Sequence, residues 1–172
     1  MPDRAGTSGN HGAERATLNA MAPDPFHLCT IAVTDIVEAA WRKILATAGE
    51  HTRPEGLPLL GPFTKMVQVA HAEPQLRQLC PWAGMWELHF SRCTGFRPTW
   101  DIPYIRTLTD GRYYVEGPHR NSPRIAETDS AQAAVAMVIE RLPPGCGPAF
   151  AGTAEELAAY ERKADPSGSK SR

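Results

Sequence analysis

The sequence has no surplus of charge of either sign. Its 172 residues include 18 Lys and Arg against 19 Asp and Glu, which gives a formal net charge of −1. A protein that binds nucleic acid needs a basic face that displaces the counterions of the phosphate backbone. The composition therefore argues against a nucleic-acid partner, although it is compatible with a local basic patch.

The sequence also has no long hydrophobic run. No run approaches the roughly 18 apolar residues that cross a membrane. The N-terminus lacks the charged region and apolar core of a signal peptide. We therefore expect a cytoplasmic protein without a membrane partner.

Cysteine is sparse as well. The four cysteines are Cys29, Cys80, Cys93 and Cys146, and without an export signal we expect reduced thiols. Pairing among them would allow three connectivities, between which the sequence does not choose. A domain of about 130–140 residues folds without a disulfide or a metal, so the scarcity of cysteine does not limit the fold.

Both ends of the chain lack an apolar period. We expect residues 1–25 and 162–172 to be disordered, because they cannot bury enough apolar surface to offset the entropy of ordering. Residues 26–161 then form a single domain.

Helical periodicity is clearest in the first part of this domain. Thr34-Asp35 supplies N-cap chemistry for a helix that ends near Gly49. Its apolar positions recur at helical spacing: Ile36, Val37, Ala40, Trp41, Ile44 and Leu45. The preceding run, His27–Val33, fits either a strand or a lead-in to this helix.

A loop rich in proline and glycine follows from residue 50 to residue 62. Phe63–His71 fits a helix or a strand, and we favour the helix. A short helix is predicted from Pro74 to Leu79, because proline is well placed at a first helical position.

Two helices are predicted near the C-terminus. The first runs from Asp129 to Leu142, with Asp129 and Gln132 as a capping box. Its apolar face contains Ala134, Val135, Val138, Ile139 and Leu142. The second runs from Ala154 to about Tyr160 behind a capping box of Thr153 and Glu156.

The segment from Leu79 to Gly117 holds three of the four tryptophans and three of the four tyrosines. It begins with a predicted half-buried strand whose residues alternate. One face carries Trp86, Leu88 and Phe90, and the other carries Glu87, His89 and Ser91.

Asp110-Gly111 predicts a hairpin with a two-residue type I′ turn, in which both residues take positive φ. The expected pairs are Thr109 with Arg112, Leu108 with Tyr113, Thr107 with Tyr114 and Arg106 with Val115. This register places Arg106 on one face with Tyr104, Leu108, Tyr113 and Val115, packed on the helix from Asp129.

Residues 117–127 are expected to be a loop. The predicted fold is therefore α+β, with an antiparallel sheet of about three strands and helices packed on one face.

Four residues are of types that could ligate a metal. His71, Cys80, His89 and Cys93 are ligand types that zinc accepts, but the Cys80 to Cys93 gap does not match a zinc knuckle. We expect Cys80 and Cys93 to be small buried hydrophobes, with no metal and no cofactor.

Cys146 lies between Gly145 and Gly147. It would be a nucleophile if a neighbouring group lowered its pKa. The alternative is that the glycines only turn the chain between two helices.

The polar strand face is the other candidate site. Glu87, His89 and Ser91, followed by Arg92, could perform acid–base chemistry if they faced a pocket, although same-face neighbours on a strand are roughly 7 Å apart. The alternative is a solvated sheet face. Arginines and aromatic residues nearby could bind an anionic or peptide ligand. The predicted binding residues are Trp82, Glu87, His89, Ser91, Arg92, Trp100 and Arg106.

Three segments together resemble an uncharacterised actinobacterial family of natural-product biosynthesis proteins. They are Ala72–Trp82 (AEPQLRQLCPW), Leu88–Arg92 (LHFSR) and Leu142–Ala149 (LPPGCGPA). The similarity covers about residues 35–156. It implies a cytoplasmic setting near peptide or secondary-metabolite pathways and supplies no catalytic residues.

These observations favour an accessory, non-catalytic protein that binds a peptide, a carrier or a biosynthetic enzyme. One alternative is a small enzyme that uses His89 or Cys146 in a pocket. Another is an immunity or antitoxin-like partner protein. A concave pocket that joins His89 to an arginine and a second titratable group would favour the enzyme, whereas a flat aromatic patch would favour the binder.

Overall fold

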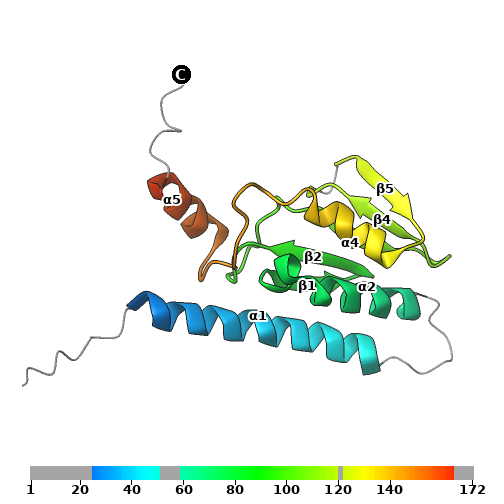
Figure 1. Cartoon of the computed structure of the whole chain (residues 1–172), viewed down its shortest axis with the longest axis horizontal. Helices are drawn as coiled ribbons and strands as arrows, with labels where there is room; N and C mark the ends of the chain where they lie inside the picture. The colour runs from blue at the N-terminus through cyan, green and yellow to red at the C-terminus, as the bar shows by residue number, and fades with distance from the viewer. Residues whose placement is uncertain (1–24, 51–58, 120–121, 165–172) are drawn as a thin grey trace, which may run out of the picture.

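The computed structural model describes residues 25–50, 59–119 and 122–164, with side chains only of residues 33–49 in the first range. Its elements are α1 (Pro25–Glu50), α2 (Leu60–Ala72), α3 (Pro74–Arg77), β1 (Cys80–Gly84), β2 (Glu87–Ser91), β3 (Tyr104–Thr107), β4 (Tyr113–Glu116), β5 (Arg124–Thr128), α4 (Ala131–Ile139) and α5 (Ala154–Ala164). The α+β class is confirmed, but the sheet has five strands where about three were predicted (Figure 1).

The two predicted tails lie outside the described residues, apart from their inner ends. Pro25 is the first residue of α1, and residues 162–164 belong to the last turn of α5.

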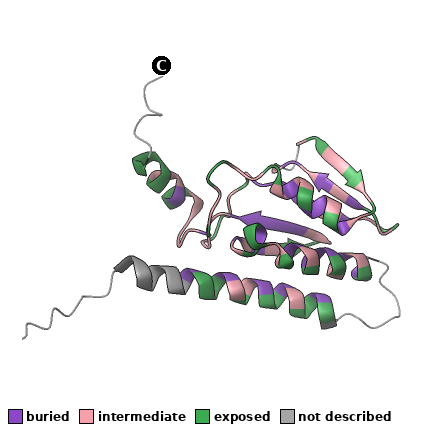
Figure 2. Ribbon diagram, viewed as in Figure 1, coloured by how far each residue is buried: buried purple, intermediate pink, exposed green. Residues whose placement is uncertain are grey.

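The five strands form an antiparallel meander in the order β1-β2-β3-β4-β5. α1 packs on β1, α4 packs on β3, β4 and β5, and α2 lies between α1 and α4. These three helices cover one face of the sheet, and the buried residues gather between the two layers (Figure 2). The other face is called the open face below.

α1 is a single helix, so both the strand option for His27–Val33 and the N-cap at Thr34-Asp35 are wrong. The local capping chemistry at residues 34 and 35 is overridden because the apolar stripe continues through them. Val33 and Val37 are one helical turn apart and both are buried, which is the spacing of one helix face.

α2 confirms the helix favoured for residues 63–71, with Phe63, Met66, Val67 and Ala70 buried. α3 begins at Pro74 as predicted and ends at Arg77, earlier than expected.

The capping of α4 differs from the prediction, whereas that of α5 agrees. Ser130, and not Asp129, caps α4, because its Oγ accepts the backbone N–H of Ala133 at 3.2 Å. The predicted box of α5 is present: Glu156 accepts from the Thr153 N–H at 2.8 Å, and the Thr153 hydroxyl accepts from the Glu156 N–H at 3.2 Å.

The two strands missed from the sequence are β1 and β5, the edges of the sheet. β1 contains Pro81, which a strand tolerates at an edge because its missing N–H is not needed there. β5 lies in the segment 117–127 that was predicted to be a loop, and its ion-pairing residues Arg124 and Glu127 obscure the strand pattern.

The β3–β4 hairpin does not have the predicted type I′ turn. Gly111 has a φ of +86°, whereas Asp110 is not among the residues with positive φ. The Leu108 N–H bonds the Arg112 carbonyl at 2.8 Å, which leaves a three-residue loop. Such loops end with a residue in the left-handed region, usually glycine.

The longer loop shifts the register by one residue. The observed pairs are Thr107 with Tyr113, Arg106 with Tyr114, Ile105 with Val115 and Tyr104 with Glu116. A one-residue shift moves side chains to the other face, so the prediction that Arg106 shares a face with Tyr113 and packs on α4 is wrong.

A two-residue turn with positive φ at both positions does occur between β1 and β2. Met85 has a φ of 52° and Trp86 a φ of 66°, and they connect the paired residues Gly84 and Glu87. This is the geometry of a type I′ turn, without the Asn-Gly sequence that usually marks it.

The core lies between the helix layer and the inner face of the sheet. Trp41 and Val138 are fully buried, as predicted. The sheet contributes Leu88, Phe90, Ile105, Tyr113 and Val115. The remaining alternate residues of β2, β3 and β4 are thereby directed to the open face.

Candidate functional site

Two rows of side chains cross the open face. In an antiparallel sheet, directly opposed residues project to the same side and contact one another. The first row runs Trp82, His89, Tyr104, Glu116, and the second runs Glu87, Arg106, Tyr114, Glu127.

The first row is a stack of rings. The His89 ring lies between the Trp82 ring, 3.8 Å away at 7°, and the Tyr104 ring, 4.3 Å away at 18°. Trp100, from the loop before β3, stands edge-on to Trp82 and His89. His89 is therefore only 6% exposed although it lies on the face without helices.

Glu87 connects the two rows. Its Oε2 lies 3.0 Å from Nε2 of His89. Its Oε1 accepts from Nε and Nη2 of Arg106 at 2.9 and 2.6 Å. Glu116 lies 3.7 Å from the same Nη2 and accepts the hydroxyl proton of Tyr104.

Burial sets the protonation of this cluster. It lowers the pKa of His89, and the hydrogen bond and charge of Glu87 oppose the shift only in part. Burial and the hydrogen bond to Glu116 raise the pKa of Tyr104 to about 12. Near pH 7 the imidazole is therefore neutral and the phenol is protonated. The hydrogen bond to the Glu87 carboxylate then requires that Nε2 of His89 carries the proton.

A cavity of about 650 Å³ opens over these side chains. Its lining residues are Trp82, Met85, Glu87, His89, Trp100, Tyr104, Arg106 and His119. The volume lies within the range typical of small-ligand sites, and so does the combination of aromatic walls with a few convergent polar groups.

Several polar atoms of the cavity residues lack a partner among the described residues, including the ring nitrogens of Trp82, Trp100 and His119. Among the described residues, His89 Nδ1 and Arg106 Nη1 make no hydrogen bond. Oδ1 of Asp101 is the one side-chain nitrogen or oxygen in this part of the chain that is both buried and unpartnered. Nδ1 and Nη1 are therefore accessible to solvent or to a ligand.

A comparison with protein families agrees with the sequence expectation of an uncharacterised family. The family DUF6193, described as a family of unknown function, matches residues 35–153, which is more than half of the chain. The chain belongs to the DUF6193 family. No curated protein and no solved structure matches it.

The DUF6193 match includes the whole sheet and every residue that lines the cavity. It ends at Thr153, at the start of α5. The open face and its cavity thus lie within the part of the chain that the family model matches.

Five of the seven predicted binding residues line the DUF6193 cavity: Trp82, Glu87, His89, Trp100 and Arg106. Ser91 is buried instead, and its Oγ bonds the Cys93 carbonyl at 2.9 Å and the Thr99 N–H at 3.1 Å. It holds the chain after β2.

Arg92 also lies away from the cavity. Its guanidinium pairs with Asp101, and with Glu161 of α5. It therefore ties α5 to the loop that carries Trp100.

Three cavity residues were not among the predicted set: Met85, Tyr104 and His119. Tyr104 was expected to face the core, and the register shift places it on the open face. Met85 and His119 lie in connections whose positions depend on hairpins that no local motif reveals.

The remaining thiols and histidines whose side chains the structure describes form no site of this kind. No group of three or more possible metal ligands occurs in residues 25–50, 59–119 and 122–164. Burial raises the pKa of Cys146 and of Cys80, which lowers the reactivity of both thiols. No helix within the described ranges is long and apolar enough to cross a membrane.

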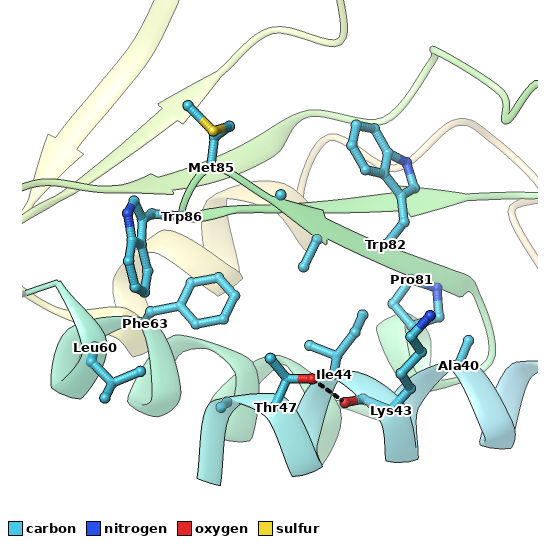
Figure 3. Close-up of a pocket in the computed structure, with 13 residues that line it drawn as sticks. Ala40, Lys43, Ile44, Thr47, Leu60, Phe63, Pro81, Trp82, Met85 and Trp86 are labelled. Carbon is cyan, nitrogen blue, oxygen red and sulfur yellow. Dashed lines mark hydrogen bonds between the residues drawn. The ribbon is translucent and has the colours of Figure 1, made fainter. Parts of the chain in front are cut away.

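A second cavity, of about 740 Å³, lies on the helix side of β1 (Figure 3). Its walls are mostly apolar residues of α1, the start of α2 and the β1–β2 hairpin, with Lys43 and Thr47 at its edge. Trp86 packs edge-on against Phe63 there. Trp82 and Met85 line this cavity as well as the one on the open face, so the β1–β2 hairpin separates the two.

Proposed function

We propose that this DUF6193 domain is an accessory binding protein and that the cavity on the open face holds its ligand. One observation supports the proposal above all others. The cavity joins exposed aromatic walls to two polar atoms, His89 Nδ1 and Arg106 Nη1, that have no partner among the described residues.

The surroundings of the cavity favour a ligand that belongs to a peptide or a partner protein. Met85 is 88% exposed, Phe96 91% and Trp100 47%. Met85 and Trp100 line the cavity, and Phe96 shares a neighbouring surface hollow with Trp100. Large apolar side chains this exposed are typical of a surface that is covered by a partner.

The resemblance noted in the sequence provides the biological setting of the proposal. It points to a cytoplasmic protein of an actinobacterial natural-product pathway, with a peptide, a carrier or a biosynthetic enzyme as the partner. The near-neutral charge of the chain and the mixed charges of the open face are consistent with a partner other than nucleic acid.

A fragment screen by NMR tests the binding role, because the four tryptophans lie in different surroundings. Trp100 lines the open-face cavity, Trp82 lines both cavities, Trp86 lines the helix-side cavity and Trp41 is buried in the core. Bound fragments should shift the indole N–H signals of Trp100 and Trp82 and leave those of Trp86 and Trp41 unchanged.

Trp100→Ala should weaken these fragments about tenfold, which corresponds to roughly 1.4 kcal/mol of binding free energy. Ile36→Ala is the matched control, since Ile36 is also 47% exposed but lies on α1. The binding role is wrong if no fragment shifts the Trp100 signal of the wild type, or if Ile36→Ala weakens binding equally.

A small enzyme is the second candidate, because the cavity joins His89, an arginine and a second titratable group. Glu87 would orient the imidazole, and Nδ1 would accept a proton from the substrate. A pathway peptide incubated with the protein should then change in mass. The change should disappear in His89→Phe, which keeps a ring in the stack, although the peptide still binds.

A further inference from the structure

We infer that the cavity recognises a neutral amide group next to an aromatic or long apolar side chain, as a peptide segment presents them. The inference rests on the proposed binding function and specifies its ligand. It is carried by the hydrogen-bonding inventory of the cavity, by the charges around Arg106 and by the exposed rings.

The inventory includes an acceptor on His89 and a donor on Arg106, besides the ring nitrogens of Trp82, Trp100 and His119. Because Nε2 of His89 donates to Glu87, Nδ1 is left as an acceptor. Nη1 of Arg106 is left as a donor, since Nε and Nη2 face Glu87. An amide supplies the complementary N–H and C=O, so it can satisfy both atoms together.

An anion is a poor fit. Arg106 already lies beside two carboxylates, Glu87 at 2.6 Å and Glu116 at 3.7 Å. A ligand carboxylate or phosphate would be repelled by both, and to bind Arg106 in the bidentate manner it would have to displace Glu87.

A cation is also disfavoured at this position. The side chain of Arg106 is 41% exposed, compared with 20% for Glu87 and 17% for Glu116. The guanidinium is therefore the charge that an incoming group meets first, while the two carboxylates are directed to partners within the protein.

The walls specify what lies beside the amide. One face of Trp82 is covered by the His89 ring, but Trp100 and Met85 remain exposed. Planar or long apolar side chains are the groups that such surfaces bury on binding. An amide and an apolar side chain are separated by one carbon in a peptide, so a single residue could fill both parts of the cavity.

Three probes that share a benzyl group test the inference. They are N-acetyl-phenylalanine amide, which is neutral, N-acetyl-phenylalanine, which is an anion, and phenylalanine amide, which is a cation near pH 7. Each is titrated into the full-length protein, with the indole signals of Trp82 and Trp100 as the readout. We expect the neutral probe to bind at least about tenfold more tightly than either charged probe.

Two variants connect the preference to the two atoms. His89→Phe keeps a ring in the stack but removes the acceptor, and Arg106→Lys keeps the charge but removes the planar fork. Each should reduce the advantage of the neutral probe to about threefold or less. Arg112→Lys is the control. Like Arg106, Arg112 belongs to the β3–β4 hairpin and pairs with two carboxylates, those of Asp110 and Glu127, but it does not line the cavity.

The outcomes separate the two proposals. If the anion or the cation binds most tightly at Trp82 and Trp100, the amide inference is wrong and the binding role stands. If no fragment of any kind shifts these signals, the proposed binding role is wrong, and the amide inference that rests on it is wrong as well. An equal loss of preference in Arg112→Lys would also overturn the inference, because that residue lies outside the cavity.

Discussion

The imidazole of His89 lies parallel to the indole of Trp82, with the ring centroids 3.8 Å apart. The Tyr104 ring covers the opposite side of the imidazole at 4.3 Å. Both faces of His89 are thus occupied, and only its edge nitrogens are available for polar contacts. Glu87 is hydrogen-bonded to Nε2, which fixes the orientation of the ring and therefore the direction in which Nδ1 points.

The buried His89 should make the protein more sensitive to acid. Its pKa is lowered in the folded state, so below about pH 6.5 the unfolded chain binds a proton that the folded chain does not. The contribution of the neutral ring to stability is complete above that pH and is lost as the pH falls toward the folded-state pKa. Urea unfolding of the wild type between pH 7.5 and 5.5 should therefore show a steeper loss than His89→Phe.

The other histidines are the same in both proteins, so the comparison isolates His89. Parallel stability curves, or a steeper curve for the variant, would contradict the protonation state assigned to the cavity.

The Glu87–Arg106 pair should couple more strongly than the ion pair in the β3–β4 loop. A double-mutant cycle of Glu87→Gln and Arg106→Met should give a coupling of about 1 kcal/mol, limited by the exposure of the guanidinium. The control cycle uses Asp110→Asn and Arg112→Met, whose side chains are both about half exposed. An equal or larger coupling in the control would show that the cavity pair is only a surface pair.

Trp41→Ala should destabilise the fold by about 3–5 kcal/mol. The side chain is fully buried, and its Nε1–H donates to the Arg77 carbonyl at 3.0 Å, so the change leaves a cavity and an unpaired carbonyl. Ile36→Ala on the same helix should cost less than about 0.5 kcal/mol, because that side chain is 47% exposed. Urea unfolding measures both, and similar losses would refute the packing of α1 described here.

Gly111→Ala should cost about 1–2 kcal/mol through backbone conformation alone. The φ of Gly111 is +86°, and a Cβ there would meet only Cγ of Pro62 at 3.8 Å. Gly61→Ala is the control, because Gly61 lies in the first turn of α2 and a Cβ would meet nothing within 4 Å. If both variants keep wild-type stability, the three-residue loop is not the conformation in solution.

The sequence predicted well where one apolar stripe decides the structure. The helical face of α1, the alternation in β2 and the capping box of α5 each depend on residues a few positions apart. The edge strands β1 and β5 were not predicted, because Pro81 and the charged residues of β5 are tolerated in a strand only where it pairs with one neighbour at the edge of a sheet. These two strands can be assigned only when the rest of the sheet is known, because a local sequence pattern does not show which strand they pair with.

Most residues of the candidate site were named from the sequence, but their positions relative to one another were not predicted. Alternation placed Glu87 and His89 on one face, but the assumed two-residue turn placed Arg106 on the other. One residue in loop length decided whether the guanidinium met Glu87 or the core. The ring stack was also beyond local reasoning, because Trp82, His89 and Tyr104 come from three strands.

The β1–β2 turn provides a test in which stability and binding should change in opposite directions. Met85 and Trp86 both take positive φ, a conformation that is unfavourable for such side chains and that asparagine tolerates. Met85→Asn should therefore stabilise the protein by about 0.5–1 kcal/mol, since the methionine is 88% exposed and gives up little packing. The same change removes an apolar wall of the cavity, so binding of N-acetyl-phenylalanine amide should weaken severalfold.

Met85→Gln is the control: it removes the same wall without the turn preference, and should weaken binding without raising the midpoint of urea unfolding. If Met85→Asn stabilises the fold and leaves binding unchanged, Met85 is only a turn residue; if it fails to stabilise, the strain assigned to this turn is wrong.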